Sequence, residues 1–186
     1  HVKLPIFVAR QWIRHRTARL NEISGRYSVM KDEFYLPPRE HISLQSTDNK
    51  QGRESEAVPP ELQDKVLDLL KSDQSASFAN YEEILSDNIA RELARINLPL
   101  SMYTEWYWQM DLKNMLHFLK LRMDSHAQWE IQEYARAIAE IVKAVCPMAY
   151  ESFDRHVLRG AKFSSDEIAA INALMEGKPN PLEGRR

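Results

Sequence analysis

The sequence predicts a single α/β domain of the α+β type, in which helices predominate and strands are few. The 186 residues fit one domain of ordinary size. With 44% hydrophobic and 28% charged residues, the composition is typical of a globular protein that buries a sizeable core. Alternating or aromatic stretches at 2–4 and 102–110 predict strands, whereas most other segments have the three-to-four-residue periodicity of amphipathic helices.

The N-terminal part predicts a strand, a helix and a long loop. Val2 and Leu4 alternate with polar neighbours, as at the end of a strand, and Pro5 is well placed to open a helix that reaches Arg16. A short extended segment is expected at 33–36. No apolar side chain occurs from 45 to 56, so we expect residues 45–57 to form a mobile surface loop.

The middle of the chain predicts two helical regions and one strand. Pro59 and Pro60 open a helix whose apolar residues share one face. A second helical region is expected from 77 to 98, with a break near Ser86 and Asp87 and an end at Pro99. The stretch from 102 to 110 is rich in aromatic residues and has weak helix signals, so it predicts a strand.

The C-terminal part predicts helices with recognisable caps. Asp111 is expected to cap a helix with a buried apolar stripe. Ser125 and Gln128 have the spacing of a capping box before a long helix that ends at Pro147. That helix has an apolar seam for packing against the core or another subunit: Ile131, Tyr134, Ile138, Ile141 and Val145. A further helix is expected at 148–159, and Ser164 is expected to cap a last one.

Composition and spacing exclude several classes of protein and site. Apolar runs stop at four residues, far short of the ~20 that cross a bilayer, and the single Cys146 favours a reducing compartment, the cytoplasm. The five glycines fit neither glycine-rich phosphate loop. The histidines lack the spacing of a zinc motif, so we expect no metal.

Positive charge is concentrated near the N-terminus although the net charge is −2. Residues 1–27 contain six Lys and Arg and the single acid Glu22. Within the segment RHRTARLNEISGRY, Arg14, His15 and Arg16 precede Ser24 and its neighbours. Such a cluster suits a phosphate or carboxylate, or it is an arginine-rich solvated surface. Glu22 either pairs with the arginines or accepts hydrogen bonds from a sugar hydroxyl.

A second constellation lies in LRMDSHAQWE. Arg122 follows apolar residues, so we expect it to be partly buried and to need an acceptor, either Asp124, a carbonyl or a ligand. Arg95 near a helix end is uninformative alone. No neighbouring histidine activates Cys146, and no motif supports Ser24 as a nucleophile.

Together these two segments resemble the sequences of the flavin-dependent thymidylate synthases. The family signature is Arg-His-Arg, seven residues and Ser, as in RHRTARLNEIS, and LHFLKLRMDSHAQWE resembles the second family block. Similarity extends through PIFVARQWIRHR, SGRYS, EFYLP and ARINLPL, and thus covers most of residues 2–158 in order.

The resemblance implies an antiparallel-sheet core with long flanking helices, the fold of that family. It implies a homotetramer with active sites at subunit interfaces, which binds FAD without a dinucleotide fold. The implied reaction uses NADPH and methylenetetrahydrofolate to convert dUMP to dTMP. The implied partners include neither nucleic acid nor a membrane.

Site residues follow from the resemblance by position. Arg122 is the implied catalytic residue, which binds the uracil ring and favours ionisation of its ring nitrogen. Ser24 is assigned to binding, and Arg95 would come from a neighbouring subunit. The implied dUMP residues are Gln11, Trp12, Ile13, Arg14, Glu22, Ile23, Ser24, Gly25, Arg26, Arg95 and Arg122, and the implied FAD residues are Arg14, His15, Arg16, Glu22, Asp111, Leu112, Lys113 and His117.

Two departures from the family leave an alternative open. Asp111 stands where the family often has Asn, and a carboxylate cannot donate a hydrogen bond as an amide does. Family members usually have a further segment before the position of His1 that helps to hold flavin and folate. A molecule without that segment would be a non-catalytic nucleotide-binding oligomer. A nucleic-acid-binding module has only the arginine cluster in its favour.

Overall fold

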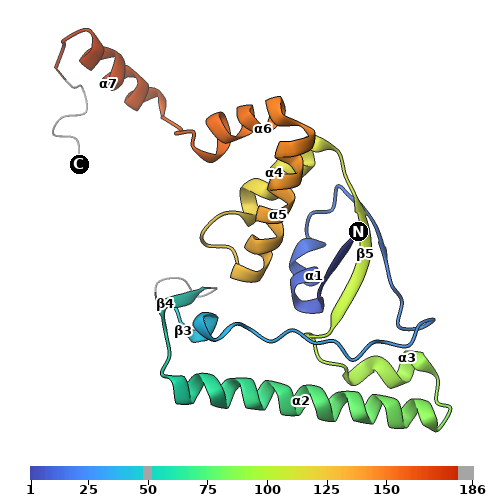
Figure 1. Cartoon of the computed structure of the whole chain (residues 1–186). Coiled ribbons are helices and arrows are strands. Elements are labelled where there is room, and N and C mark those ends of the chain that lie inside the picture. The colour runs from blue at the N-terminus through green and yellow to red at the C-terminus, as the bar shows by residue number, and fades with distance from the viewer. Residues whose placement is uncertain (48–51, 180–186) are drawn as a thin grey trace. The chain divides into compact units, whose positions relative to one another are not determined.

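The structure is a computed structural model that describes residues 1–47 and 52–179. Within the chain, His1–Ala139 and Glu140–Arg186 form two compact units, which are described separately below (Figure 1). All the predicted site residues belong to the first unit.

An antiparallel three-stranded sheet is at the centre of the first unit. Its strands are β1 (Val2–Pro5), β5 (Tyr103–Gln109) and β2 (Arg19–Glu22), in the order β1-β5-β2. Leu4 pairs with Thr104, and Glu22 pairs with Trp106. The strands expected at 2–4 and 102–110 and the antiparallel core are confirmed. The sequence did not indicate β2, because its four residues are exposed and have no apolar alternation.

Helix α1 (Ile6–Trp12) follows β1 directly, as Pro5 predicts. It ends four residues before Arg16, so the expected helix to that residue is too long. The amides of Arg14 and His15 hydrogen-bond only three residues back, to the carbonyls of Gln11 and Trp12. The Arg-His-Arg motif therefore lies in the turn after the helix rather than on it.

The described residues between 33 and 57 contain more strand structure than the sequence predicts. Phe34 forms an isolated bridge with Met102, and β3 (Ser43–Gln45) pairs antiparallel with β4 (Arg53–Ala57). The two ends of the expected 45–57 loop are thus strands, while its residues 48–51 lie outside the described part. Polar side chains suit this hairpin, since those of its side chains that the structure describes are exposed or half-buried.

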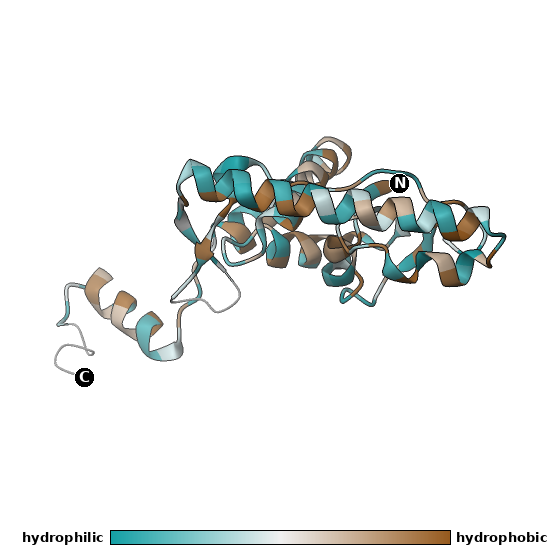
Figure 2. Cartoon of the chain, turned by 90° about the horizontal axis from the view of Figure 1, so that it is seen from below, coloured by the Kyte–Doolittle hydropathy of each residue, from teal (hydrophilic) through white to brown (hydrophobic). Residues whose placement is uncertain are grey.

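A single long helix, α2 (Pro60–Ser86), replaces the two expected helices up to residue 86. Hydrophobic and hydrophilic residues alternate by turns along it (Figure 2). The predicted break at Ser86 is confirmed, and Asn88 there has a positive φ of 58°. After the break come the short α3 (Arg91–Ala94) and the 3-10 helix η2 (Arg95–Asn97), and another turn, η1 (Arg39–His41), precedes β3.

Two groups of buried side chains fix these elements to the sheet. Phe78, Tyr81, Ala94 and Met102 join α2, α3 and the start of β5. In the second group, Trp12 is fully buried and its ring lies 4.9–5.7 Å from three other aromatic rings: Trp106, Trp108 and Phe118. Such aromatic clusters bury a large apolar area, so the end of α1 is held rigidly.

Helices α4 (Leu112–Arg122) and α5 (Trp129–Val145) complete the neighbourhood of the site. The Asp111 side chain accepts from the Asn114 amide at 3.0 Å, which confirms the predicted cap. The predicted capping box at Ser125 is wrong, because α5 begins only at Trp129 and the carbonyl of Gln128 accepts its first amides. Residues 123–128 instead form a turn between the two helices.

The second unit contains the last residues of α5 and three further elements. α6 (Pro147–Phe153) runs into the π-helix η3 (Asp154–Leu158), and α7 (Ser165–Met175) begins with the capping box of Ser164 and Glu167 that the sequence predicts. Ile141 and Val145 of the α5 seam are exposed in the chain. No helix within 1–47 and 52–179 is both long and apolar enough to span a membrane.

Candidate functional site

The first group of site residues surrounds Arg122 at the end of α4. Its Nε donates to Nε2 of His15, and its Nη2 donates to the carbonyl oxygen of Gln11, both at 3.0 Å. Asp124, an acceptor considered from the sequence, instead accepts from the backbone amide of His126 at 2.9 Å. Arg122 is therefore half-buried between neutral acceptors, a carbonyl and an imidazole.

Burial sets the charge of His15. Desolvation, helped by the positive charge of Arg122 and by His117, lowers the pKa of His15 to about 4. His15 is thus neutral at physiological pH and can accept the hydrogen bond from Arg122. Burial also lowers the pKa of Arg122, but the guanidinium stays charged because arginine is not deprotonated in proteins.

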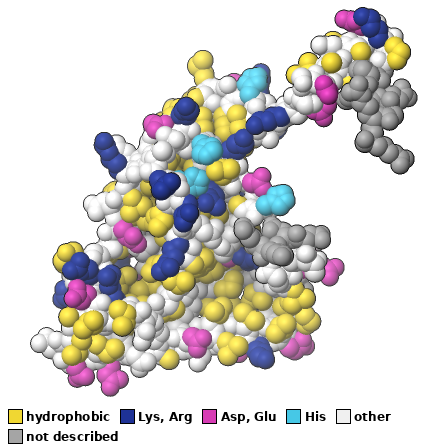
Figure 3. Space-filling view, turned by 180° about the vertical axis from the view of Figure 1, so that it is seen from behind, with side chains coloured by type: hydrophobic (Ala, Val, Ile, Leu, Met, Phe, Trp, Pro, Cys, Tyr) yellow, Lys and Arg dark blue, Asp and Glu magenta, His cyan; other side chains and the backbone are white. Residues whose placement is uncertain are grey.

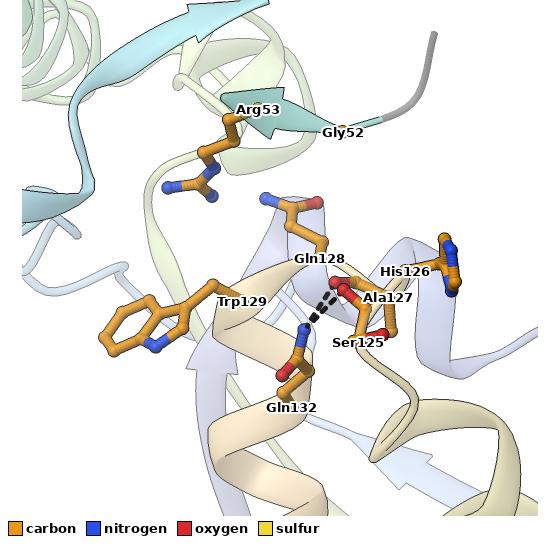
Figure 4. Close-up of a pocket in the computed structure, with 8 residues that line it drawn as sticks. All are labelled: Gly52, Arg53, Ser125, His126, Ala127, Gln128, Trp129 and Gln132. Carbon is orange, nitrogen blue, oxygen red and sulfur yellow. Dashed lines mark hydrogen bonds between the residues drawn. The ribbon is translucent and has the colours of Figure 1, made fainter. Parts of the chain in front are cut away.

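A polar pocket of about 330 Å³ adjoins this group. The Gln11 amide donates to Oε1 of Gln128, and Gln128 lines the pocket together with Arg53 of β4 and the first turn of α5. Arg53 and Gln128 extend toward each other across it (Figure 4). Buried Glu130 accepts from Arg53 at 2.6 Å and from the Tyr35 hydroxyl at 2.9 Å, which ties the hairpin to α5.

The second group lines another cavity, of about 370 Å³, beside β2 and η2. Glu22, Ile23, Gly25 and Arg95 from the predicted set meet there, together with Arg10. A Cβ on Gly25 would lie 3.0 Å from Cδ of Arg95, so glycine allows this arginine to lie against the backbone. Two guanidinium groups beside a carboxylate suit a ligand with both a phosphate and a hydroxyl.

Ser24 and Arg26 flank this second group. The Arg26 amide donates to Oγ of Ser24 at 3.3 Å, and the exposed Arg26 guanidinium pairs with Glu92 at 3.2 Å. Within residues 1–47 and 52–179, Ser24 forms no hydrogen bond to a histidine or carboxylate side chain. A general base for nucleophilic attack is therefore not in place.

The remaining predicted flavin residues lie around the end of α1 and the start of α4. The rings of His15 and His117 are 6.5 Å apart, and several side chains there are exposed: Arg14, Arg16, Asp111, Leu112, Lys113 and His117. Figure 3 shows a face on which Lys, Arg and His side chains gather next to hydrophobic ones. The hydrogen bond from Asn114 holds the pKa of Asp111 below its usual range.

The structure places one predicted nucleotide residue, Trp12, less favourably than its neighbour Ile13. The Trp12 side chain is fully buried, so only its backbone is available to a ligand, whereas Ile13 is half-exposed. The predicted binding sets left out Arg10, Thr104 and Gln128, although Arg10 belongs to the N-terminal cluster of cations and Gln128 to the segment LRMDSHAQWE around Arg122.

Comparisons with known proteins identify the family of the chain. The model of the Thy1 family, "Thymidylate synthase complementing protein", matches residues 1–148. The flavin-dependent thymidylate synthase of Treponema denticola is 62% identical over 185 residues, which cover 100% of this chain and 70% of that protein. The enzyme of the same name from Treponema pallidum is 53% identical, with 100% of this chain and 61% of that protein covered.

A solved structure is similar as well. The UMP/dUMP methylase PolB from Streptomyces cacaoi, bound with 5-Br UMP, superposes with a TM-score of 0.76 and 29% sequence identity, over 81% of this chain and 69% of that one. The chain spans roughly two thirds of the length of these relatives. On this identity and this coverage, the chain belongs to the Thy1 family, that of the flavin-dependent thymidylate synthases.

Proposed function

We propose that the protein catalyses the reductive methylation of dUMP to dTMP, with FAD as cofactor, methylenetetrahydrofolate as carbon donor and NADPH as reductant. The single observation that supports it most is Arg122, a half-buried cation held by neutral groups beside the Arg-His-Arg turn. Similarity to enzymes named as thymidylate synthases and as a dUMP methylase favours this function over a non-catalytic nucleotide-binding oligomer. The single cysteine favours a cytoplasmic location.

Each active site is shared between copies of the chain in a homotetramer. The Arg10 side chain lines the second cavity while the Gln11 side chain donates to Gln128 in the Arg122 group, and side chains of adjacent helix residues point about 100° apart. Among the described residues, no hydrogen bond joins the Arg122 group to Glu22, Gly25 or Arg95. A nucleotide that needs both groups would therefore lie between one copy's Arg122 and another copy's Arg95.

Within this shared site each group has its own part of dUMP. Arg95 and Arg26, with the backbone at Gly25, would bind the phosphate, and Glu22 would accept from a sugar hydroxyl. The Arg122 guanidinium would bind the uracil ring and stabilise the negative charge that forms on its nitrogen. Ser24 would donate its hydroxyl to a phosphate oxygen and take no part in attack.

The exposed residues around α4 fit a flavin dinucleotide. Its pyrophosphate needs cations, which the exposed side chains of Arg14, Arg16 and Lys113 offer. The exposed His117 adds a ring donor. Asp111 suits this role less well, because its carboxylate already accepts from Asn114 and cannot donate. When bound, the flavin would supply the hydride chemistry, while these residues orient it and exclude water.

One absorption spectrum tests the proposal. The purified full-length protein is expected to be yellow, to release FAD on denaturation and to change its flavin spectrum when dUMP is added. An Arg122→Ala variant is expected to lose dTMP formation while it keeps FAD. A colourless protein without FAD affinity, or unchanged turnover in that variant, would contradict the proposal.

A further inference from the structure

We propose that His15 is a positioning residue that fixes the Arg122 guanidinium without cancelling its charge, so that the outer fork of this arginine is presented to an anionic pyrimidine. This inference rests on the proposed function, in which Arg122 binds the uracil ring. It means that His15, the middle residue of the Arg-His-Arg turn, acts by holding Arg122. It does not act as a cation that binds phosphate.

The hydrogen bonds of Arg122 account for one edge of its planar guanidinium. The Nε–H and one N–H of Nη2 point along the same edge, and these donate to His15 and to the Gln11 carbonyl. Three of the five N–H groups remain, two on Nη1 and one on Nη2. They form the outer fork, whose two parallel donors match a carbonyl oxygen beside a ring nitrogen.

Both groups that hold Arg122 are neutral. A carboxylate partner would offset most of the field of the guanidinium at the ligand, but the nearby Asp124 bonds to His126 instead. Among residues 1–47 and 52–179, Arg122 has no ion pair with a carboxylate. The full positive charge is therefore available to an anion that forms on the substrate.

The surroundings of His15 keep it in the accepting state. Its ring packs edge-on against Phe118, with the centroids 4.9 Å apart, and lies near the His117 ring. Because Nε2 accepts from Arg122, the proton of the neutral ring is on Nδ1. The low pKa of His15, caused first by burial and then by Arg122, agrees with this geometry.

Two substitutions separate positioning from simple packing. In His15→Gln the side-chain oxygen can still accept from Arg122, whereas in His15→Phe a ring remains without an acceptor. His156→Phe is the matched control, since His156 is exposed in η3 of the second unit. Each variant is made in the full-length protein, and FAD content and the dissociation constants of dUMP and 5-bromo-dUMP are measured by flavin absorbance.

Bromine at carbon 5 makes the ring nitrogen more acidic, so 5-bromo-dUMP depends less on Arg122 to form its anion. We expect His15→Phe to weaken dUMP binding about tenfold or more, as for a lost hydrogen bond to a charged group, and 5-bromo-dUMP clearly less. We expect His15→Gln to stay within about threefold of the wild type, and FAD content is compared in every variant because His15 is also among the flavin residues that the family resemblance implies.

Equal binding of dUMP by His15→Phe and the wild type would overturn the inference. Equal weakening of both nucleotides, or loss of FAD with it, would also overturn it, because that is the result of general damage to the site. A wild-type protein that binds FAD but neither nucleotide would instead contradict the proposed function.

Discussion

The hydroxyl of Thr104 lies 2.6 Å from Oε1 of Glu22 and links the central strand β5 to the end of β2. Thr104 is almost completely buried, so its rotamer is fixed by the core around it. One carboxylate oxygen of Glu22 is thereby held, and the other remains for a ligand in the cavity that Glu22 shares with Arg95.

Thr104→Val removes this support and keeps the shape of the side chain. Because a hydrogen bond to a charged group is lost, we expect the KM for dUMP to rise about tenfold, with FAD content unchanged. Thr104→Ser keeps the hydroxyl and is the control, expected near the wild-type KM. A steady-state dUMP titration of both variants checks this, and equal KM values for Thr104→Val and the wild type would refute the role of this contact.

Gly25→Ala tests the close approach of Arg95. The new Cβ would lie 3.0 Å from Arg95 Cδ and from Met30 Sδ, so these side chains must move. We expect dUMP affinity to fall about tenfold, because a small displacement of a binding group is costly, with little change in the free energy of unfolding.

The control for this prediction is Gly177→Ala in the second unit. Gly177 has a φ of +71°, so alanine there would cost about 1 kcal/mol of stability without any change in dUMP affinity. Binding measured by flavin absorbance and unfolding measured in urea separate the two cases. Weaker nucleotide binding in the Gly177 variant would contradict this division.

The ion pair of Arg53 and Glu130 is expected to stabilise the hairpin strongly. Burial alone would raise the pKa of Glu130, but the hydrogen bonds from Arg53 and Tyr35 outweigh burial and lower it. Arg53→Met leaves this buried carboxylate without its cation, so we expect a loss of about 3 kcal/mol in the free energy of unfolding.

Arg155→Met is the matched control, since Arg155 pairs with Glu151 where both side chains are more than 60% exposed. Loss of that pair is expected to cost less than about 0.5 kcal/mol. Urea unfolding of the two variants measures the difference. Similar losses in both variants would show that the Arg53 pair gains nothing from burial.

Stability is expected to fall in two steps as the pH is lowered. His15 has a pKa of about 4 in the folded chain and 6.5 as its ordinary value, so between these values the unfolded chain binds the proton and the folded chain does not. Glu130, with a pKa held below 4.5, adds a loss below that pH. The sign follows from linkage, because protons favour the state that binds them.

Urea midpoints measured from pH 7.5 to pH 4 check this prediction. The wild type is expected to lose stability below pH 6.5, and His15→Gln, which has no titrating ring, is expected to lose less between pH 6.5 and 4.5. A steeper decline of the urea midpoint with falling pH in the variant would mean that His15 is not buried in its neutral form in the folded chain.

Local sequence signals predicted much of the fold. The aromatic strand after Met102, the cap at Asp111 and the capping box at Ser164 each depend on residues within one element. Strand β2 was missed because its side chains are exposed and mostly polar, and only pairing with β5 makes it a strand. The late start of α5 was missed because Ser125 has cap chemistry in a turn that tertiary contacts decide.

The residues of the candidate site were predicted from the family motif rather than from the charge and burial of the individual side chains. The charge pattern left Arg122 open between a structural and a binding role, and no local rule pairs it with His15, which is 107 residues away. Arg10 and Thr104 reach the second cavity only through the packing of α1 and β5. Such contacts depend on the fold as a whole and are not encoded in residue spacing.

Mixing two inactive variants tests the shared active site most directly. Full-length Arg95→Ala and Arg122→Ala subunits are unfolded together, refolded and assayed for dTMP formation. If each site combines Arg95 of one copy with Arg122 of another, random assembly restores about a quarter of wild-type activity, since intact sites form only where two unmodified groups meet. Full inactivity of the mixture, with hybrid oligomers shown to be present, would contradict the account.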